Sequence, residues 1–302
     1  MNMINIEINK GITYITIKNN SHLTLVLSSL GASMFALYYD DELLTLSLKN
    51  KDDFLNKELY HGKTIGPVCG RIKDGRIGLY HYEMNEDNVA RHGGDNGLSN
   101  QNFGYQYNEK NDTISLLFTY QGFTVEYVLA MKEDTFFIKY YYQGHKQPIS
   151  LTNHSFFHLG GPFNDLRLKI NSDEFVNFDK KTLVPLEKEK IIPCLDFNKG
   201  QSLNKNINDP YLINSRTKGY DHFLYFSDDK ELVLKNKKYQ LILNTDFTGV
   251  QIYSDNYDFK EETIDGRTGI RKALAVEPQD SPLERKIYSR YRRYIKYTIA
   301  HI

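Results

Sequence analysis

Short runs of alternating apolar and polar residues fill this chain from end to end, and they constrain its fold more than any other feature. Alternation with a period of two is typical of a β-strand with one buried face. Clusters of Asn, Asp, Lys, Gly and Ser, which favour turns, separate the runs, so the strands are predicted to be antiparallel. The predicted strands are Tyr14–Lys18, Leu23–Ser28, Ser33–Tyr39, Ile114–Tyr120, Phe123–Met131, Thr135–Gln143, Leu166–Ile170, His222–Phe226, Glu231–Lys235, Tyr239–Asn244, Gly249–Ser254, Leu274–Gln279 and Tyr294–Ile302.

Helix signals are few by comparison. The best is Asp52–Tyr60, where an acidic start and the spacing of Phe54, Leu55 and Leu59 predict two helical turns. So many strands cannot form one flat sheet, because large sheets twist, curl and split, so a sandwich or barrel is expected. The predicted fold class is all-β with few short helices. No linker, composition change or internal repeat divides residues 1–302, which predicts a single domain.

Composition narrows the possible partners. Lys+Arg and Asp+Glu number 38 each, and no long charged block breaks the balance. The sequence therefore predicts no nucleic-acid or membrane partner and favours a neutral or lightly charged substrate. Cys69 and Cys194 show no metal-ligand or redox spacing, so buried free thiols are expected. No signal-peptide pattern or membrane span is recognisable, which predicts a soluble, cytoplasmic protein.

The stretch Ser150–Gly161, with the sequence SLTNHSFFHLGG, brings an imidazole to the end of a strand. If the two-residue period continues, His154, Phe156 and His158 share one face. Histidine titrates near neutral pH, so His154 beside Asn153 is a candidate proton donor or acceptor. The alternative is a partly buried, hydrogen-bonded core histidine, and the stretch by itself favours that alternative.

Three further segments each carry one candidate polar side chain. Arg71 lies in the glycine-rich GPVCGRIKDGR, where its guanidinium could bind hydroxyl oxygens or simply pair with a nearby acid. His92 precedes two glycines, which allow close approach of the backbone to a ligand, or it is a solvent-exposed turn histidine. Asp221 enters an aromatic strand in GYDHF, where a strand-end cap is the ordinary explanation.

The segment Ala273–Asp280, ALAVEPQD, is the most informative by its period. Glu277 and Gln279 share a face with small alanines, which leave room for a ligand. Pro278 cannot donate to a ladder, so this segment is expected at a strand end or an edge. The alternative is an ordinary solvent-facing glutamate on a sheet.

Six short motifs, in this order across nearly the whole chain, resemble those of the aldose 1-epimerases, also called galactose mutarotases. The motifs are Gly-Pro-Val-Cys-Gly-Arg-Ile-Lys-Asp-Gly, His-Gly-Gly, Thr-Asn-His-Ser-Phe-Phe-His-Leu, Gly-Tyr-Asp-His-Phe, Gly-Val-Gln-Ile-Tyr-Ser and Val-Glu-Pro-Gln. The resemblance implies a large antiparallel β-sandwich, the galactose mutarotase-like supersandwich, whose concave face binds an aldohexose. It also implies roles for seven residues: Glu277 as general base, His154 as general acid, Arg71, His92 and Asp221 as ligands of sugar oxygens, and Gln279 and Asn153 as supporting groups.

The implied chemistry interconverts the α and β anomers of a hexose such as glucose or galactose. One base removes the proton of the C1 hydroxyl while one acid protonates the ring oxygen, and the open chain recloses on the other face. These steps require no cofactor, and no residue cluster has metal-ligand spacing, so neither a cofactor nor a metal is expected. The expected partner is a small-molecule sugar, and the expected assembly is a monomer or homodimer.

The chain departs from the family pattern at its rim. Phe103 replaces a common tryptophan, Leu98 a frequent aromatic residue and His158 a usual asparagine, and a mid-chain loop is shortened to Gln121–Phe123. A phosphorylated or otherwise modified sugar therefore remains an alternative substrate. Three other functions also remain open: a glycoside hydrolase using Asp221 and Glu277, a non-catalytic carbohydrate-binding sandwich, and an interaction module without a sugar site.

Overall fold

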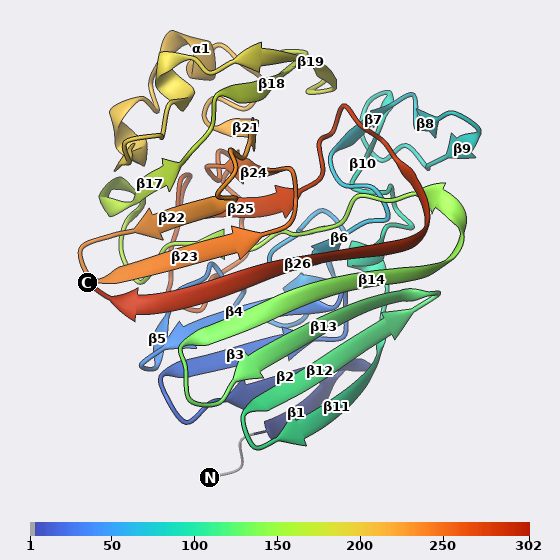
Figure 1. Cartoon of the computed structure of the whole chain (residues 1–302), viewed down its shortest axis with the longest axis vertical. Coiled ribbons are helices and arrows are strands. Elements are labelled where there is room, and N and C mark those ends of the chain that lie inside the picture. Colours follow the sequence, from blue (N-terminus) through green and yellow to red (C-terminus); the bar gives the residue numbers. More distant parts are fainter. Residues whose placement is uncertain (1–3) are drawn as a thin grey trace.

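The computed structural model describes residues 4–302, and antiparallel sheets make up most of it (Figure 1). The largest sheet in this range has nine strands in the order β11-β12-β13-β14-β26-β23-β22-β17-β20. At its centre, the long strands β14 and β26 pair from Thr135 opposite Thr298 to Pro148 opposite Ile287. The strand bounds are β11 Gly104–Lys110, β12 Thr113–Tyr120, β13 Phe123–Ala130, β14 Thr135–Pro148, β26 Ile287–His301, β23 Tyr239–Thr245, β22 Glu231–Lys235, β17 Arg167–Ile170 and β20 Gln201–Ser202.

Two smaller sheets complete the sandwich over the described residues. A five-stranded sheet has its strands in chain order, and a six-stranded sheet has the order β16-β25-β24-β21-β18-β19. The first consists of β1 Ile4–Asn9, β2 Ile12–Lys18, β3 Leu23–Ser28, β4 Ser33–Tyr39 and β5 Glu42–Leu43. The second consists of β16 Phe156–Phe157, β25 Leu274–Gln279, β24 Gly249–Tyr253, β21 Asp221–Tyr225, β18 Glu174–Phe178 and β19 Pro185–Lys190.

Short elements connect these sheets. The remaining strand pairs are β6 Thr64–Ile65 with β15 Thr152–Asn153, β7 Arg71–Lys73 with β10 Val89–Arg91, and β8 Arg76–Ile77 with β9 Tyr80–His81. The helical turns are η1 Asp53–Leu55, η2 Leu98–Asn100, η3 Phe163–Asp165, η4 Pro193–Leu195, η5 Leu203–Lys205 and α1 Pro210–Ile213. None of the helices in residues 4–302 combines the length and hydropathy needed to cross a membrane.

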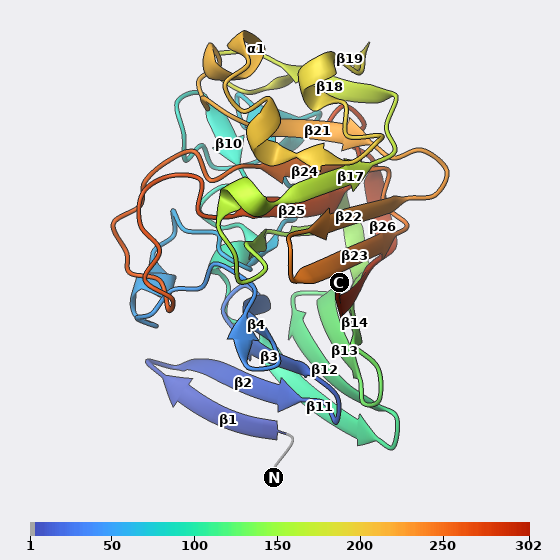
Figure 2. The same ribbon diagram turned by 90° about the vertical axis from the view of Figure 1, so that its left-hand side faces the viewer.

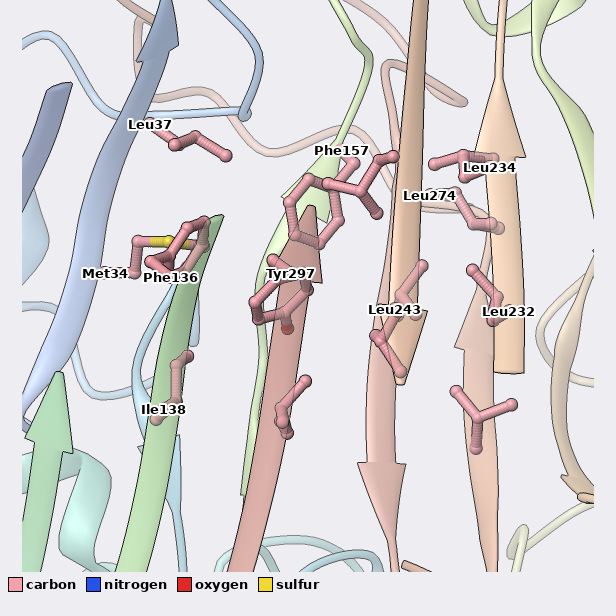
Figure 3. Close-up of a cluster of buried hydrophobic side chains, with 14 of the residues drawn as sticks. Met34, Leu37, Phe136, Ile138, Phe157, Leu232, Leu234, Leu243, Leu274 and Tyr297 are labelled. Atoms are coloured by element: carbon pink, nitrogen blue, oxygen red, sulfur yellow. The ribbon is translucent and has the colours of Figure 1, made fainter. Parts of the chain in front are cut away.

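One hydrophobic cluster joins the three large sheets. Figure 3 shows part of this cluster, to which five strands contribute: Leu37 of β4, Ile138 of β14, Tyr297 of β26, Leu243 of β23 and Leu274 of β25. Figure 2 shows β21, β24 and β25 stacked beside β22, β23 and β26. The alternating side chains of each strand therefore supply the core between layers, as the sequence pattern predicts.

The predicted sandwich and its thirteen strands are confirmed: four strands have the predicted bounds, and the ends of the others are shifted by at most seven residues. The largest shift is at β26, which begins at Ile287 rather than at Tyr294, because its ladder with β14 continues past an irregularity between Gln143 and Gln147. Both cysteines are buried and free, also as predicted. Strands of two or three residues, such as β7 and β15, are too short to produce a recognisable period.

The predicted helix over Asp52–Tyr60 is wrong. The structure has one 3-10 turn there, Asp53–Leu55, and the backbone of Asn56 is extended. The Asn56 side chain accepts a hydrogen bond from the Glu58 N–H at 3.0 Å, which offers the backbone an alternative to a helix. Phe54 is buried edge-on against Phe35, with ring centroids 5.0 Å apart, so its apolar spacing reflects this local packing.

Candidate active site

A cavity of about 330 Å³ lies against β21, β24 and β25 of the six-stranded sheet. Figures 1 and 2 show these strands next to one another, and Figure 1 shows the loops around β7 and β10 nearby. The residues that line the cavity are Glu58, Leu59, Tyr60, His61, Gly70, Arg71, Arg91, His92, His154, Phe156, Phe178, Leu183, Thr217, Asp221, Gln251, Tyr253, Asp255, Tyr257, Phe259, Glu277, Gln279 and Pro282.

Strand register aligns the polar groups of the cavity floor. Gln251 of β24 is directly opposite Glu277 of β25, and Tyr253 of β24 is opposite Asp221 of β21. Because paired residues project from the same side of a sheet, these four side chains share one face. Glu277 is 3% exposed, so the alternative of a solvent-facing glutamate is wrong. Leu274 and Val276, on the other face, enter the core, as the period predicts.

The position of Pro278 also fits the predicted strand end. Pro278 is opposite Val250 of β24, whereas β16, the neighbour of β25 on its other side, pairs only with Leu274 and Ala275. The missing N–H of the proline therefore interrupts no ladder on that side. This short neighbour leaves the end of β25 beside the cavity rather than beneath another strand.

The backbone around His154 is held on two sides. His154 donates its N–H to the carbonyl of Lys63 at 2.9 Å and accepts the Gly62 N–H at 2.9 Å. The next residue, Ser155, accepts the Val276 N–H at 3.1 Å, which ties this segment to β25. Gly62 has a positive φ of 66°, and a Cβ there would lie 1.9 Å from the Met34 carbonyl oxygen, so a glycine is required for this close approach.

His154 and Glu277 are in direct contact. His154 Nε2 lies 3.3 Å from Glu277 Oε1. Burial raises the pKa of Glu277 well above its ordinary value, and burial lowers the pKa of His154 to about 3. Both shifts disfavour a net charge on the pair, so the pair retains one proton that either side chain can carry. Among the described residues, His154 Nδ1 has no hydrogen-bond partner, so no contact fixes its tautomer.

Arg71 and His92 reach the cavity from the small sheet of β7 and β10. Arg71 is opposite Arg91 in this pair, and His92 follows directly. The His92 N–H donates to the Gly70 carbonyl at 2.9 Å, and His92 Nδ1 accepts the Gly70 N–H at 3.3 Å. Because Nδ1 is an acceptor, the neutral ring of His92 carries its proton on Nε2. His92 is only partly exposed, so the alternative of a solvent-exposed turn histidine is wrong.

The two glycines after His92 serve the backbone rather than a ligand. A Cβ at Gly93 would lie 2.4 Å from the Gly66 carbonyl oxygen, and one at Gly94 would lie 2.3 Å from the Glu83 carbonyl oxygen. Both also have positive φ, at 88° and 74°. The interpretation that these glycines let the backbone approach a ligand is therefore wrong, because they accommodate neighbouring chain segments.

Asp221 lies at the first position of β21 and faces the cavity. Gln251 donates from Nε2 to Asp221 Oδ1 at 2.5 Å. Burial raises the pKa of Asp221, and the positive charge of Arg71 opposes this shift. Asp221 is thus more than a strand-end cap, since its carboxyl group is part of the cavity floor.

Two other residues of the segment Ser150–Gly161, Asn153 and His158, do not line the cavity, whereas His154 does. Asn153 is fully buried and does not line the cavity; its Nδ2 donates to the Gly62 carbonyl at 2.7 Å, behind His154. His158 also lies outside the cavity lining, so the predicted shared face with His154 and Phe156 is wrong for it. The N–H groups of His158 and Leu159 both donate to the Leu44 carbonyl, at 3.0 and 3.1 Å, and the chain turns away there.

Sequence reasoning missed several lining side chains. Gln251 and Tyr253 alternate within the motif Gly-Val-Gln-Ile-Tyr-Ser, so the two-residue period could have identified them. Arg91 precedes His92, but only the pairing of β7 with β10 reveals its place. Glu86 lies outside the cavity lining but accepts a hydrogen bond from the lining residue Arg71 (Nε) at 2.9 Å, and no sequence signal marks it.

The arrangement offers acid/base chemistry in a partly buried cavity. Over residues 4–302, no three His, Cys, Asp or Glu side chains are grouped in a way that could hold a metal ion. His154 instead contacts Glu277, and Asp221 accepts a hydrogen bond from Gln251; Gln279 also lines the cavity. A polyhydroxylated neutral ligand suits such a lining, because directional donors and acceptors surround it.

Comparisons with known proteins identify the family of this chain. A family model described as aldose 1-epimerase matches residues 13–287. The galactose mutarotase of Homo sapiens is 27% identical over 271 residues, covering 79% of this chain and 72% of that protein. The galactose mutarotase of Mus musculus is 25% identical over 297 residues, covering 87% of this chain and 84% of that protein.

Solved structures share the fold. A galactose 1-epimerase from Lactobacillus acidophilus superposes with a TM-score of 0.87 at 19% identity, covering 99% of this chain and 98% of that one. An aldose epimerase homologue from C. elegans superposes with a TM-score of 0.79 at 22% identity, covering 96% and 99%. The family model spans nearly the whole chain, and the chain therefore belongs to the aldose 1-epimerase family of isomerases.

Proposed function

We propose that this protein is an aldose 1-epimerase that interconverts the α and β anomers of an unphosphorylated aldohexose such as glucose or galactose. The observation that carries this proposal is the 3.3 Å contact between His154 Nε2 and Glu277 Oε1 in the floor of the cavity. The anomeric hydroxyl oxygen and the ring oxygen are bonded to the same carbon of the sugar. Two neighbouring proton-transfer groups can therefore reach both oxygens at once.

In the proposed reaction, the Glu277 carboxylate takes the proton of the C1 hydroxyl and the His154 imidazolium protonates the ring oxygen. The bond between C1 and the ring oxygen breaks, which leaves an open-chain aldehyde, a protonated Glu277 and a neutral His154. After rotation about the bond between C1 and C2, both proton transfers reverse and the ring closes on the other face. The pair has the same number of protons before and after, so each turnover regenerates it.

Before the sugar binds, the surroundings of Glu277 and His154 partly oppose the charged forms that this reaction uses. Burial favours the neutral forms of both side chains, whereas the charge of Arg71 lowers the pKa of Glu277. Sugar hydroxyl groups that donate to the carboxylate would lower its pKa further, since hydrogen bonds to the charged form favour it. Substrate binding and activation of Glu277 are thereby coupled.

The other predicted residues hold the sugar in this proposal. Arg71 and the Nε2–H of His92 donate to sugar oxygens, Asp221 accepts from hydroxyl groups, and Gln279 does both. Asn153 acts from behind the cavity, because its hydrogen bond to the Gly62 carbonyl supports the backbone that holds His154. Its role is positioning rather than direct binding.

The charges of the cavity favour an unphosphorylated substrate. The acidic lining residues outnumber the arginines: Glu58, Asp221, Asp255 and Glu277 against Arg71 and Arg91. Both arginines also face Glu86, with nitrogen to oxygen distances of 2.9 and 3.9 Å. A phosphate dianion would meet several carboxyl groups and few uncommitted positive charges, which is unfavourable in a buried site.

Polarimetry on freshly dissolved α-D-glucose and α-D-galactose tests the proposal. The protein should raise the mutarotation rate above the spontaneous rate in proportion to its concentration, and it should act on glucose 6-phosphate more slowly. No acceleration with either hexose would overturn the function, and sugar binding by calorimetry in that case would indicate a binding module. Release of nitrophenol from aryl glycosides would instead indicate hydrolysis by Asp221 and Glu277.

A further inference from the structure

We propose that the outer face of β14 and β26 binds an acidic, extended segment of a partner protein. This surface, called the basic face below, consists of Lys139 and Tyr141 of β14 and of Arg290, Arg292 and Lys296 of β26. It shares no residue with the lining of the sugar cavity, so the proposal is independent of the proposed function.

The strand period turns these side chains away from the core. In β26, Tyr291, Ile295 and Tyr297 are buried in the large hydrophobic cluster, and the residues of the basic face alternate with them. Arg292 is directly opposite Tyr141 of β14, so these two side chains project from the same side of the sheet. Figure 1 shows β14 and β26 at the front of the molecule, with no other strand across them.

The positive charges of the basic face recur at a regular spacing. Arg290, Arg292 and Lys296 are on β26, and Lys139 of β14 is opposite Tyr294, at the position between Arg292 and Lys296. Residues on one face of a strand follow one another at about 7 Å, so the four cations extend over roughly 20 Å. An extended peptide has the same repeat. A segment with an acidic residue at every second position therefore matches the row of cations.

Most of these cations have no acidic partner in the chain. Within residues 4–302, no carboxyl group forms an ion pair with Arg290, Arg292 or Lys296, and the Lys139 ammonium lies 3.8 Å from a Glu126 carboxylate oxygen. The chain as a whole has as many acidic as basic residues, so this excess belongs to the face and not to the composition. An anionic partner therefore meets positive charge that the protein itself does not neutralise.

Aromatic rings under the cations restrict what binds here. The Arg292 guanidinium carbon lies 5.8 Å from the centroid of the Tyr141 ring, and the Lys139 and Lys296 ammoniums lie 5.7 and 6.0 Å from that of Phe137. These contacts limit the motion of the cationic side chains, so less conformational entropy is lost on binding. Because cations lie over the rings, the rings offer nucleic-acid bases little free surface for stacking. This arrangement favours an acidic peptide over a single-stranded nucleic acid.

Fluorescence anisotropy with labelled peptides tests the proposal on the native protein. The acidic probe alternates Glu and Ser and is long enough to span the basic face, and the control probe has Gln in place of Glu. The acidic probe should bind with a Kd below about 1 mM at low salt, and about tenfold more weakly at about 0.5 M NaCl, because salt screens exposed charges. No binding of the acidic probe, or equal binding of both probes, would overturn the proposal.

A double charge reversal locates the binding surface. Arg292→Glu combined with Lys296→Glu should weaken binding of the acidic probe by about tenfold, because it replaces two attractions with two repulsions. Lys199→Glu combined with Lys205→Glu is the matched control, since it changes the net charge equally at exposed lysines on either side of β20. The control should bind as the native protein does. Equal losses in both double variants would show that only the net charge acts, and would refute the assignment to the basic face.

Two further probes separate the acidic peptide from other polyanions. Poly(U) represents single-stranded nucleic acid, and phosphatidylserine vesicles represent an anionic membrane surface. Neither should bind more tightly than the acidic peptide. Tighter binding of either one, lost in the variant with Arg292→Glu and Lys296→Glu, would overturn the assignment of the basic face to a protein partner.

Discussion

Glu86 joins Arg71, which lines the cavity, to Arg216, which directly precedes the lining residue Thr217. Its Oε2 accepts the Arg71 Nε–H at 2.9 Å and its Oε1 accepts an Arg216 Nη2 hydrogen at 2.5 Å. The Arg71 and Glu86 side chains are 15% and 13% exposed, so solvent screens this ion pair only in part. Arg71 is thus both a residue paired with a nearby acid and a residue of the cavity lining, and the two readings of the sequence are compatible.

Glu86→Gln should raise KM for the hexose by about tenfold, because a neutral amide orients the Arg71 guanidinium less firmly. The kcat should change much less, since sugar hydroxyl groups are held similarly in the ground state and the transition state. Steady-state polarimetry separates the two constants. Glu262→Gln is the control, because it removes an exposed pair with Lys49. An equal loss in kcat would show that Arg71 acts in the transition state instead.

Glu277→Gln and His154→Asn should each lower kcat by about 10²–10⁴, the usual contribution of one general acid or base. The double variant should be little slower than either single variant, because the two groups act as a unit. Thermal melting checks that the fold survives. His145→Asn, at an exposed position of β14, should leave kcat unchanged. A near-normal kcat in either Glu277→Gln or His154→Asn would mean that another residue acts as the general base or the general acid.

The pH profile of kcat/KM should reflect the coupled pair rather than two independent groups. Burial lowers the pKa of His154 to about 3 and raises that of Glu277, so both a second proton on the pair and loss of its single proton are disfavoured. The decrease of kcat/KM at low pH should therefore be centred below pH 6.5, which is the ordinary pKa of a histidine. Polarimetry with the spontaneous rate subtracted measures this profile. An acid limb centred near 6.5 would indicate a hydrated imidazole and contradict the buried contact.

The sequence predicts the strands well because their signal is local, whereas much of the cavity depends on contacts between distant segments. Alternation alone places Glu277 and Gln279 on one face, and the structure puts both in the cavity lining. Glu86 differs, because its partner Arg216 is 130 residues away and nothing in the intervening sequence marks the pair. Local reasoning also fails where a strand ends unexpectedly, as it does at His158.

His61→Phe should stabilise the protein more at low pH than at neutral pH. His61 is 6% exposed, and among residues 4–302 neither of its ring nitrogens has a hydrogen-bond partner. Burial lowers its pKa from the ordinary histidine value of 6.5 to about 3. A lowered folded-state pKa stabilises the folded protein above pH 6.5, and this contribution is lost as the pH falls towards 3, because the unfolded chain binds the proton first.

At pH 5 this linkage costs the native protein about 2 kcal/mol, and phenylalanine removes the cost. The difference in the free energy of unfolding between His61→Phe and the native protein should therefore be about 2 kcal/mol more favourable at pH 5 than at neutral pH. Urea unfolding at the two pH values measures this difference, and it does so even if the larger ring introduces a constant packing strain. If this difference is independent of pH, His61 binds a proton as readily in the folded protein as in the unfolded chain. That result would show that the ring of His61 is hydrated rather than enclosed by Phe156 and Phe259.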